Sequence, residues 1–121
     1  MKTLRILLVE DENIIAVLLA DILAEMGHEV CAIEATEAGA VAAAARTRPD
    51  LMIVDERLVE GSGVSAVREI LLSRFVPHIF VSGDLLSDRS IGPEAVVIQK
   101  PYFDGDLVRA IDRAMAGASP A

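Results

Sequence analysis

The chain has 121 residues, of which 53% are hydrophobic and 25% are charged. Disordered chains are poor in apolar residues, so this composition predicts one folded domain. Lysine and arginine total 11 against 19 aspartate and glutamate, and the net charge of −8 argues against nucleic acid as a partner, because phosphates repel an acidic surface. No apolar stretch approaches the roughly 18 residues of a membrane span. The first apolar run is also too short for a signal peptide, so we expect a cytoplasmic protein with no membrane partner.

Short apolar runs alternate along the chain with longer segments of helical periodicity. In chain order, the pattern predicts a strand at 5–9, a helix at 12–26, a strand at 29–33, a helix at 36–46, a strand at 51–54, a helix at 64–74, strands at 78–81 and 95–98, and a helix at 103–116. The core-facing stripe of the first helix is expected to be Ile15, Leu18, Leu19, Ile22 and Met26. We expect a single domain over 1–121, with its core at about 2–116 and a frayed tail at 117–121.

Strands interleaved with helices predict an α/β fold with a parallel sheet covered on both faces. Such sheets place their sites beyond the carboxyl ends of the strands. Polar residues stand at four of these ends: Glu10, Asp11 and Glu12 after the first strand, Asp55 after the third, Ser82 after the fourth and Lys100 after the fifth. Because parallel neighbours bring these ends to one rim, we expect a cluster of carboxylates with one hydroxyl and one ammonium.

This cluster has the chemistry of a phosphoryl site. Adjacent carboxylates repel one another unless a cation neutralises them, and an oxygen-rich cluster suits Mg²⁺. A metal, a hydroxyl and an ammonium can together clamp the charge of a phosphoryl group. The chain has no P-loop and no GxGxxG run, so no nucleotide cradle is predicted. Each signal alone also fits a helix N-terminus or a turn, and only their joint appearance carries the prediction.

At these residues the sequence resembles the receiver domain of two-component response regulators, from about 2 to 116. The matching segments are 6–11, which ends in an acidic pair, 52–55, which ends in an aspartate, 80–83, which holds Ser-Gly, and 99–101, which holds Lys-Pro. The run 55–63 also keeps the family's spacing from the aspartate to the glycine that begins the third helix. The resemblance implies a flavodoxin-like sandwich with a five-stranded parallel sheet in the order 2-1-3-4-5.

The resemblance assigns a role to each residue that would handle the phosphoryl group. Asp55 is implied as the phosphoacceptor, whose carboxylate attacks phosphorus and becomes an aspartyl phosphate. Lys100 is implied to pair with Asp55 and then with a phosphoryl oxygen. Ser82 is implied to hydrogen-bond another phosphoryl oxygen, which is the switching contact. The Lys100–Pro101 bond is expected to be cis, since X–Pro bonds carry only a small cis penalty.

The resemblance also implies a Mg²⁺ cofactor, for which Mn²⁺ can substitute. Asp11 and Asp55 are expected to bind the metal directly, together with the backbone carbonyl of Arg57. Glu10 is expected to reach the metal through water. Glu12 is expected only in the first turn of its helix.

The sequence departs from the family's usual pattern at three places. Val59 stands where the family usually has proline, which we expect only to loosen the loop. Val97 replaces an aromatic switch residue, so aromatic coupling to Ser82 cannot operate as usual. The stretch 82–100 is short, which predicts a short, irregular or mobile helix there and an unusual output face. This shortened segment also resembles a receiver subgroup partnered with atypical bacterial histidine kinases.

We expect a stand-alone receiver that accepts phosphoryl from a histidine kinase, or exchanges it with a histidine phosphotransfer protein, and then contacts an unknown downstream protein. It is expected to be no enzyme beyond catalysing its own phosphorylation and dephosphorylation. His28 and His78 are expected in solvated or capping roles, outside the relay.

Three alternative functions are disfavoured by the residues at the predicted site. The first is a phosphorylation-independent pseudo-receiver, disfavoured by the intact set of site residues. A phosphohydrolase with an aspartyl nucleophile needs a second aspartate two residues later, where Arg57 stands. A flavin carrier needs a hydroxyl- and glycine-rich loop after the first strand, where the acidic triplet would repel its phosphate.

Overall fold

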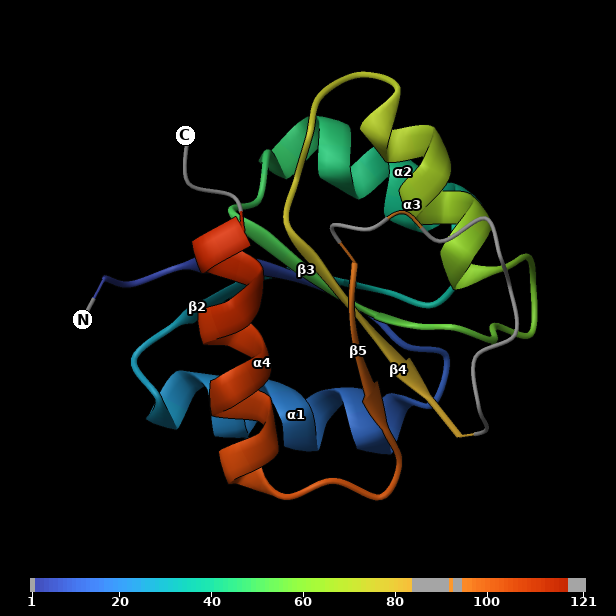
Figure 1. Cartoon of the computed structure of the whole chain (residues 1–121). Helices are drawn as coiled ribbons and strands as arrows, with labels where there is room; N and C mark the ends of the chain where they lie inside the picture. The colour runs from blue at the N-terminus through green and yellow to red at the C-terminus, as the bar shows by residue number, and fades with distance from the viewer. Residues whose placement is uncertain (1, 84–91, 93–94, 118–121) are drawn as a thin grey trace.

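In a computed structural model, the chain forms a sheet of five parallel strands between two pairs of helices (Figure 1). The structure describes residues 2–83, 92 and 95–117. The strands lie in the order β2-β1-β3-β4-β5, which confirms the predicted fold class and strand order. They are β1 (Arg5–Val9), β2 (Glu29–Glu34), β3 (Leu51–Asp55), β4 (His78–Ser82) and β5 (Val96–Gln99).

Four helices are found among the described residues: α1 (Asn13–Glu25), α2 (Glu37–Thr47), α3 (Gly63–Leu71) and α4 (Asp104–Gly117). Side-chain caps fix where two of them begin, since the Thr36 hydroxyl accepts from the backbone N–H of Gly39 and the Ser62 hydroxyl accepts from that of Ser65. The prediction for α3 ran to residue 74 and was three residues too long. The helix expected between residues 82 and 100, and the tail beyond 117, lie outside the described residues.

Alternate strand residues build two separate cores. Ile6 and Leu8 of β1 pack with α1 and α4 on one face of the sheet. Leu7 and Val9 pack with α2 and α3 on the other face. Figure 1 shows the same division, with α1 and α4 on one side of the sheet and α2 and α3 on the other. Strands buried on both faces read as unbroken apolar runs, which is why the sequence identified them.

The buried face of α1 differs from the expected stripe. Ala16, Leu19 and Leu23 are buried, whereas Leu18 is 58% exposed. Residues 14–20 are all apolar, so periodicity could not select one face. The small side chain of Ala16 lets the helix approach the sheet, and packing therefore turns Leu18 outward.

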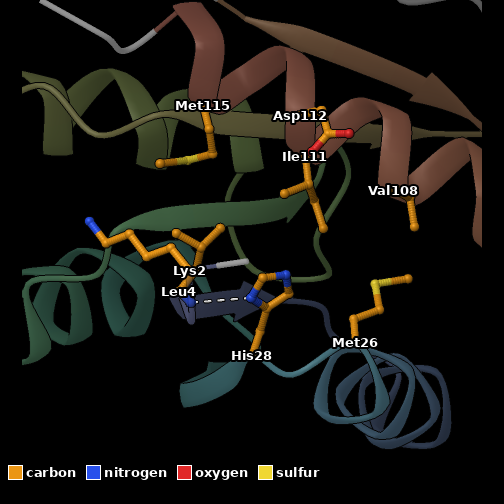
Figure 2. Close-up of a pocket in the computed structure, with 8 residues that line it drawn as sticks. All are labelled: Lys2, Leu4, Met26, His28, Val108, Ile111, Asp112 and Met115. Carbon is orange, nitrogen blue, oxygen red and sulfur yellow. Dashed lines mark hydrogen bonds between the residues drawn. The ribbon is translucent and has the colours of Figure 1, made fainter.

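The two histidines lie at the opposite end of the sheet from the predicted site, near the amino ends of the strands. His28 is buried, and its Nδ1 accepts a hydrogen bond of 3.1 Å from the backbone N–H of Leu4 (Figure 2). His78 is buried with its ring edge-on to Phe80. The expectation of solvated side chains was wrong, because both rings are buried, whereas their hydrogen bonds to backbone groups agree with the expected capping alternative. No helix among the described residues is long and apolar enough to cross a bilayer.

Candidate functional site

The carboxyl ends of β1 and β3 bring three carboxylates together. One side-chain oxygen from each of Glu10, Asp11 and Asp55 lies within 4.8 Å of the others. The strands β1 and β3 are hydrogen-bonded neighbours, with Val9 opposite Val54, so the residues that follow them emerge side by side. Glu10 is buried, and Asp11 and Asp55 are half-buried. The structure therefore confirms the prediction that these three side chains lie together at the carboxyl edge of the sheet.

Lys100 enters the same cluster from the end of β5. Its Nζ lies 3.3 Å from Oδ2 of Asp55 and 4.0 Å from Oε1 of Glu10. Its backbone N–H donates to the carbonyl of Ser82 at 2.7 Å, and the Lys100–Pro101 peptide is cis as expected. Partial burial alone would lower the pKa of Lys100, but the charges of Asp55 and Glu10 outweigh it and the pKa is raised. The ammonium therefore stays charged beside the carboxylates.

Glu10 has the most altered carboxyl group of the cluster. Burial raises its pKa to about 7, and the negative charge of Asp55 acts in the same direction. The backbone N–H of Glu12, which donates to Oε2 of Glu10 at 3.1 Å, and the charge of Lys100 oppose this rise. Glu12, which was expected in the first turn of its helix, instead precedes the first residue of α1 and makes no capping bond with its side chain. Without a cation, Glu10 therefore gains or loses its proton near neutral pH.

The loop after β3 is tied to the carboxylates by its backbone. The N–H of Arg57 lies 3.3 Å from Oδ1 of Asp55, and the N–H of Val59 donates to Oδ2 of Asp11 at 2.7 Å. The expectation that Val59 would only loosen the loop was wrong. Proline has no N–H, so valine adds a donor that holds the loop to Asp11. The assignment of the Arg57 carbonyl to a metal stays a prediction.

Glu37, at the start of α2, anchors the far side of the same loop. Its carboxylate accepts from the backbone N–H of Ser62 at 2.9 Å and from the hydroxyl of Ser65 at 2.7 Å. These hydrogen bonds lower the pKa of Glu37, with the Ser65 hydroxyl making the largest contribution. The sequence analysis did not select Glu37, because its partners lie 25 and 28 residues away.

Gly63 allows the loop to close against β3. A Cβ at this position would overlap the carbonyl oxygen of Asp55 and press on the side chain of Val54. The backbone N–H of Gly63 donates to the carbonyl of Glu56 at 2.9 Å. Only glycine fits this approach, which gives a physical reason for the spacing between Asp55 and Gly63.

Ser82 ends β4 with a hydroxyl that is already hydrogen-bonded. Its Oγ donates to Oε1 of Glu56 at 3.0 Å, and the residue is only 1% exposed. Glu56 follows Asp55 in the chain, but the sequence analysis gave it no role. A signal was available, since an acidic residue directly after a buried strand adds one more charge to an already acidic rim.

The three carboxylates fit a small divalent cation. Mg²⁺ takes oxygen ligands, is bound through a few carboxylates and keeps several waters. Glu10, Asp11 and Asp55 supply hard oxygen atoms close enough together to share one ion, and they lie at an open rim where water can complete the coordination. Their mutual repulsion is the reason that a cation would be favoured here.

Comparison with known proteins agrees with this geometry. The model of the response regulator receiver domain family matches residues 6–112. The chain belongs to this family. The receiver fold thus accounts for the order of the strands and for the acidic rim at their carboxyl ends.

Several relatives of this receiver have been described. The transcriptional regulatory protein PdtaR of Mycobacterium tuberculosis is 33% identical over 117 residues, which cover 93% of this chain and 57% of PdtaR. The phyllosphere-induced regulator PhyR of Methylorubrum extorquens is 34% identical, over 91% of this chain and 43% of PhyR. The chain therefore spans about half the length of these relatives.

Solved receiver structures show the same fold. The solution structure of the PhyR receiver domain of Erythrobacter litoralis is 30% identical, with a TM-score of 0.87 over 100% of this chain and 97% of that one. The anti-anti-sigma factor PhyR of Bartonella quintana is 27% identical, with a TM-score of 0.84 over 96% of this chain and 49% of that protein. The likeness supports signalling as the general role of this receiver.

Proposed function

We propose that this receiver accepts a phosphoryl group on Asp55 from a histidine kinase or a histidine phosphotransfer protein. The observation that carries the proposal is the Lys100 ammonium, 3.3 Å from a side-chain oxygen of Asp55, which is also one of the three clustered carboxylates. A lone aspartate at a strand end would have no such partner. The aspartate, the ammonium and the nearby Ser82 supply the nucleophile and two charge-stabilising groups that phosphoryl transfer needs.

In the proposed reaction, a carboxylate oxygen of Asp55 attacks phosphorus in line with the nitrogen of a phosphohistidine. The new P–O bond forms as the P–N bond breaks, and the imidazole nitrogen leaves with the bonding electron pair. Lys100 exchanges its contact with Asp55 for one with a phosphoryl oxygen, and Ser82 donates to another. The chain catalyses only this transfer and the later hydrolysis of its own acyl phosphate.

Glu10, Asp11, Asp55 and the carbonyl of Arg57 would hold Mg²⁺, with Glu10 acting through water, and Mn²⁺ can substitute. The metal supplies positive charge that offsets the negative charge of the phosphoryl oxygens. Asp11 also anchors the loop through the Val59 N–H, so the residue that holds the metal keeps the loop beside Asp55.

Three exposed apolar side chains around the rim support a protein as the donor. Ile14 in the first turn of α1 is 75% exposed, Val59 after β3 is 86% exposed and Phe103 after β5 is 83% exposed. Large apolar groups that ring a charged site are typical of a surface on which another protein docks. The full set of partners is thus proposed to be a kinase or phosphotransfer protein and a downstream protein, without nucleic acid or membrane.

The named relatives suggest the downstream effect and the compartment. PhyR of Bartonella quintana is described as an anti-anti-sigma factor. We propose that phosphorylation of this receiver changes its contacts with a protein. We also propose a cytoplasmic location, where kinases that use ATP form phosphohistidine.

Intact mass spectrometry after incubation with acetyl phosphate and Mg²⁺ tests the proposal. We expect one added phosphoryl group on the wild type, none on Asp55→Ala and none without the metal. Hydroxylamine should remove it, because it cleaves acyl phosphates. An unmodified wild-type chain that also binds no Mg²⁺ would favour the phosphorylation-independent pseudo-receiver instead.

A further inference from the structure

We propose that Glu56 is a latch on the Ser82 hydroxyl, which it holds in the unphosphorylated receiver and which phosphorylation of Asp55 must release. This inference rests on the proposed function, in which Ser82 moves to a phosphoryl oxygen. It assigns Glu56 as a positioning residue that sets how readily the receiver switches.

The latch follows from the number of protons on the hydroxyl. Ser82 Oγ donates to Oε1 of Glu56 at 3.0 Å. A serine hydroxyl has one proton, so it can donate to Glu56 or to a phosphoryl oxygen, but not to both. The two contacts therefore define two exclusive states of the same side chain. The free energy gained from the hydrogen bond between Ser82 and the phosphoryl group is therefore reduced by the free energy lost when the hydrogen bond to Glu56 breaks.

The alternation of side chains along the strands places the latch away from the carboxylate of Asp55. Phe80 of β4 and Val54 of β3 belong to the core on the α2 and α3 face. Ser82 ends β4 two residues after Phe80, and Glu56 directly follows β3, two residues after Val54, so both continue on this face. Asp55 lies between Val54 and Glu56 and projects to the other face, where Lys100 meets it. Ser82 must therefore rotate to reach a phosphoryl group on Asp55.

Backbone hydrogen bonds hold Glu56 in place, so we propose that the exchange needs side-chain rotation. The N–H of Glu56 donates to the carbonyl of Val81 at 3.0 Å, and the carbonyl of Glu56 accepts from the N–H of Gly63 at 2.9 Å. Ser82 is buried, and a buried hydroxyl is costly to leave without a partner. Glu56 is half-buried, so its released carboxylate can turn to water.

Charge makes phosphorylation the event that opens the latch. A phosphoryl group adds about −1.5 to −2 charge on Asp55, which makes its oxygens strong acceptors for the proton of Ser82. Before phosphorylation, the carboxylate of Glu56 is the favoured acceptor because hydrogen bonds to charged groups are stronger than those to neutral groups. Glu56 thereby opposes switching until the phosphoryl group is present.

A double-mutant cycle in the 121-residue chain tests the latch, with calorimetry of beryllofluoride binding in the presence of Mg²⁺ as the readout. Beryllofluoride mimics a phosphoryl group on an aspartate. We expect Glu56→Ala to tighten binding about tenfold, the size of a lost hydrogen bond to a charged group. In a Ser82→Ala background, the same substitution should change binding less than about twofold. Equal tightening in both backgrounds would show simple charge repulsion and overturn the latch, as would no tightening at all.

Glu56→Gln is the matched control and keeps the test decisive if Glu56→Ala does not fold. The amide still accepts a hydrogen bond but carries no charge. We therefore expect Glu56→Gln to raise the affinity for beryllofluoride about threefold, and we expect this increase to depend on Ser82. In amide NMR spectra without beryllofluoride, the Ser82 resonance of Glu56→Ala should move toward its position in the bound wild type. An unmoved resonance would contradict the latch.

Beryllofluoride binding by the wild type and by Asp55→Asn distinguishes a failure of the latch from a failure of the proposed function. Beryllofluoride should bind the wild type and not Asp55→Asn. If the wild type binds no beryllofluoride, both the proposed function and the latch are contradicted. A wild type that binds, together with a Glu56→Ala variant of equal affinity, leaves the proposed function intact and rejects only the latch.

Discussion

The two ends of the sheet hold cavities of similar size, both lined mainly by apolar side chains, that differ in how their charged groups are arranged. At the carboxyl ends of the strands, a cavity of about 300 Å³ is lined by apolar side chains together with Glu10, Asp55 and Lys100. At the amino ends, a pocket of about 330 Å³ between α1 and α4 is lined mainly by apolar residues such as Leu4, Met26 and Met115, with His28 and the charged residues Lys2 and Asp112 also in its lining (Figure 2).

The difference shows that side-chain chemistry, not cavity volume, distinguishes the functional end. At the carboxyl end, charges are gathered at a rim where a cation and a phosphoryl group can neutralise them. At the amino end, the buried histidine serves the backbone, since its Nδ1 accepts from Leu4. Substitutions at the carboxyl end should therefore affect both stability and phosphorylation, whereas substitutions at the amino end should affect stability alone.

The largest effect is expected for Gly63→Ala at the carboxyl end. A methyl group here overlaps the carbonyl of Asp55, so the loop or the end of β3 must move. We expect a loss of about 3 kcal/mol in the free energy of unfolding, measured by chemical denaturation, and slower phosphorylation by acetyl phosphate. Gly105→Ala in α4 is the control, because only the flexible side chain of Arg109 lies near its Cβ. Equal stability of the two variants would contradict the close packing at Gly63.

At the amino end, His28→Leu should destabilise the fold without slowing phosphorylation. Leucine fills the space but leaves the Leu4 N–H without its acceptor, at a cost of about 2 kcal/mol in unfolding free energy. His28→Asn keeps an oxygen near the position of Nδ1 and should recover part of this loss. A phosphorylation rate that falls in the leucine variant would show that the two ends are coupled.

The pH dependence of stability should identify Glu10 as the carboxyl group of the site whose ionisation destabilises the fold. Its pKa is raised from 4.5 to about 7 by burial, so in metal-free protein its contribution to stability is complete below pH 4.5 and is lost as the pH rises through 7. Glu10→Gln removes this titration. We expect the variant to gain stability relative to the wild type between pH 4.5 and 7, measured by denaturant unfolding in chelator. A constant difference across this range would contradict the raised pKa.

The smallest effect is expected for Glu37→Gln, on the outer side of the loop. The pKa of Glu37 is lowered by its bonds to Ser65 and Ser62, so its contribution to stability is present above its usual pKa and is lost as the pH falls through the lowered value. The variant should unfold at a lower temperature than the wild type at pH 7, and the difference should shrink as the pH falls through the lowered pKa of Glu37. Glu60→Gln, an exposed position in the same loop, is the control.

The strand order and the composition of the acidic rim were predictable because both depend on local pattern. Apolar runs such as 51–54 identify strands buried on both faces, and parallel strands deliver the residues after them to one edge. Asp11, Asp55 and Lys100 therefore meet as predicted. The face of α1 was not predictable, because its first two turns are apolar all round.

The sequence by itself determined which elements form and which residues reach the carboxyl ends of the strands. Only the tertiary structure decided the hydrogen-bond partners at these ends. Ser82 with Glu56, Val59 with Asp11 and His28 with Leu4 are separated by 26, 48 and 24 residues respectively. No local periodicity reports such pairs, because they depend on the register of neighbouring strands and on the path of the loops between them.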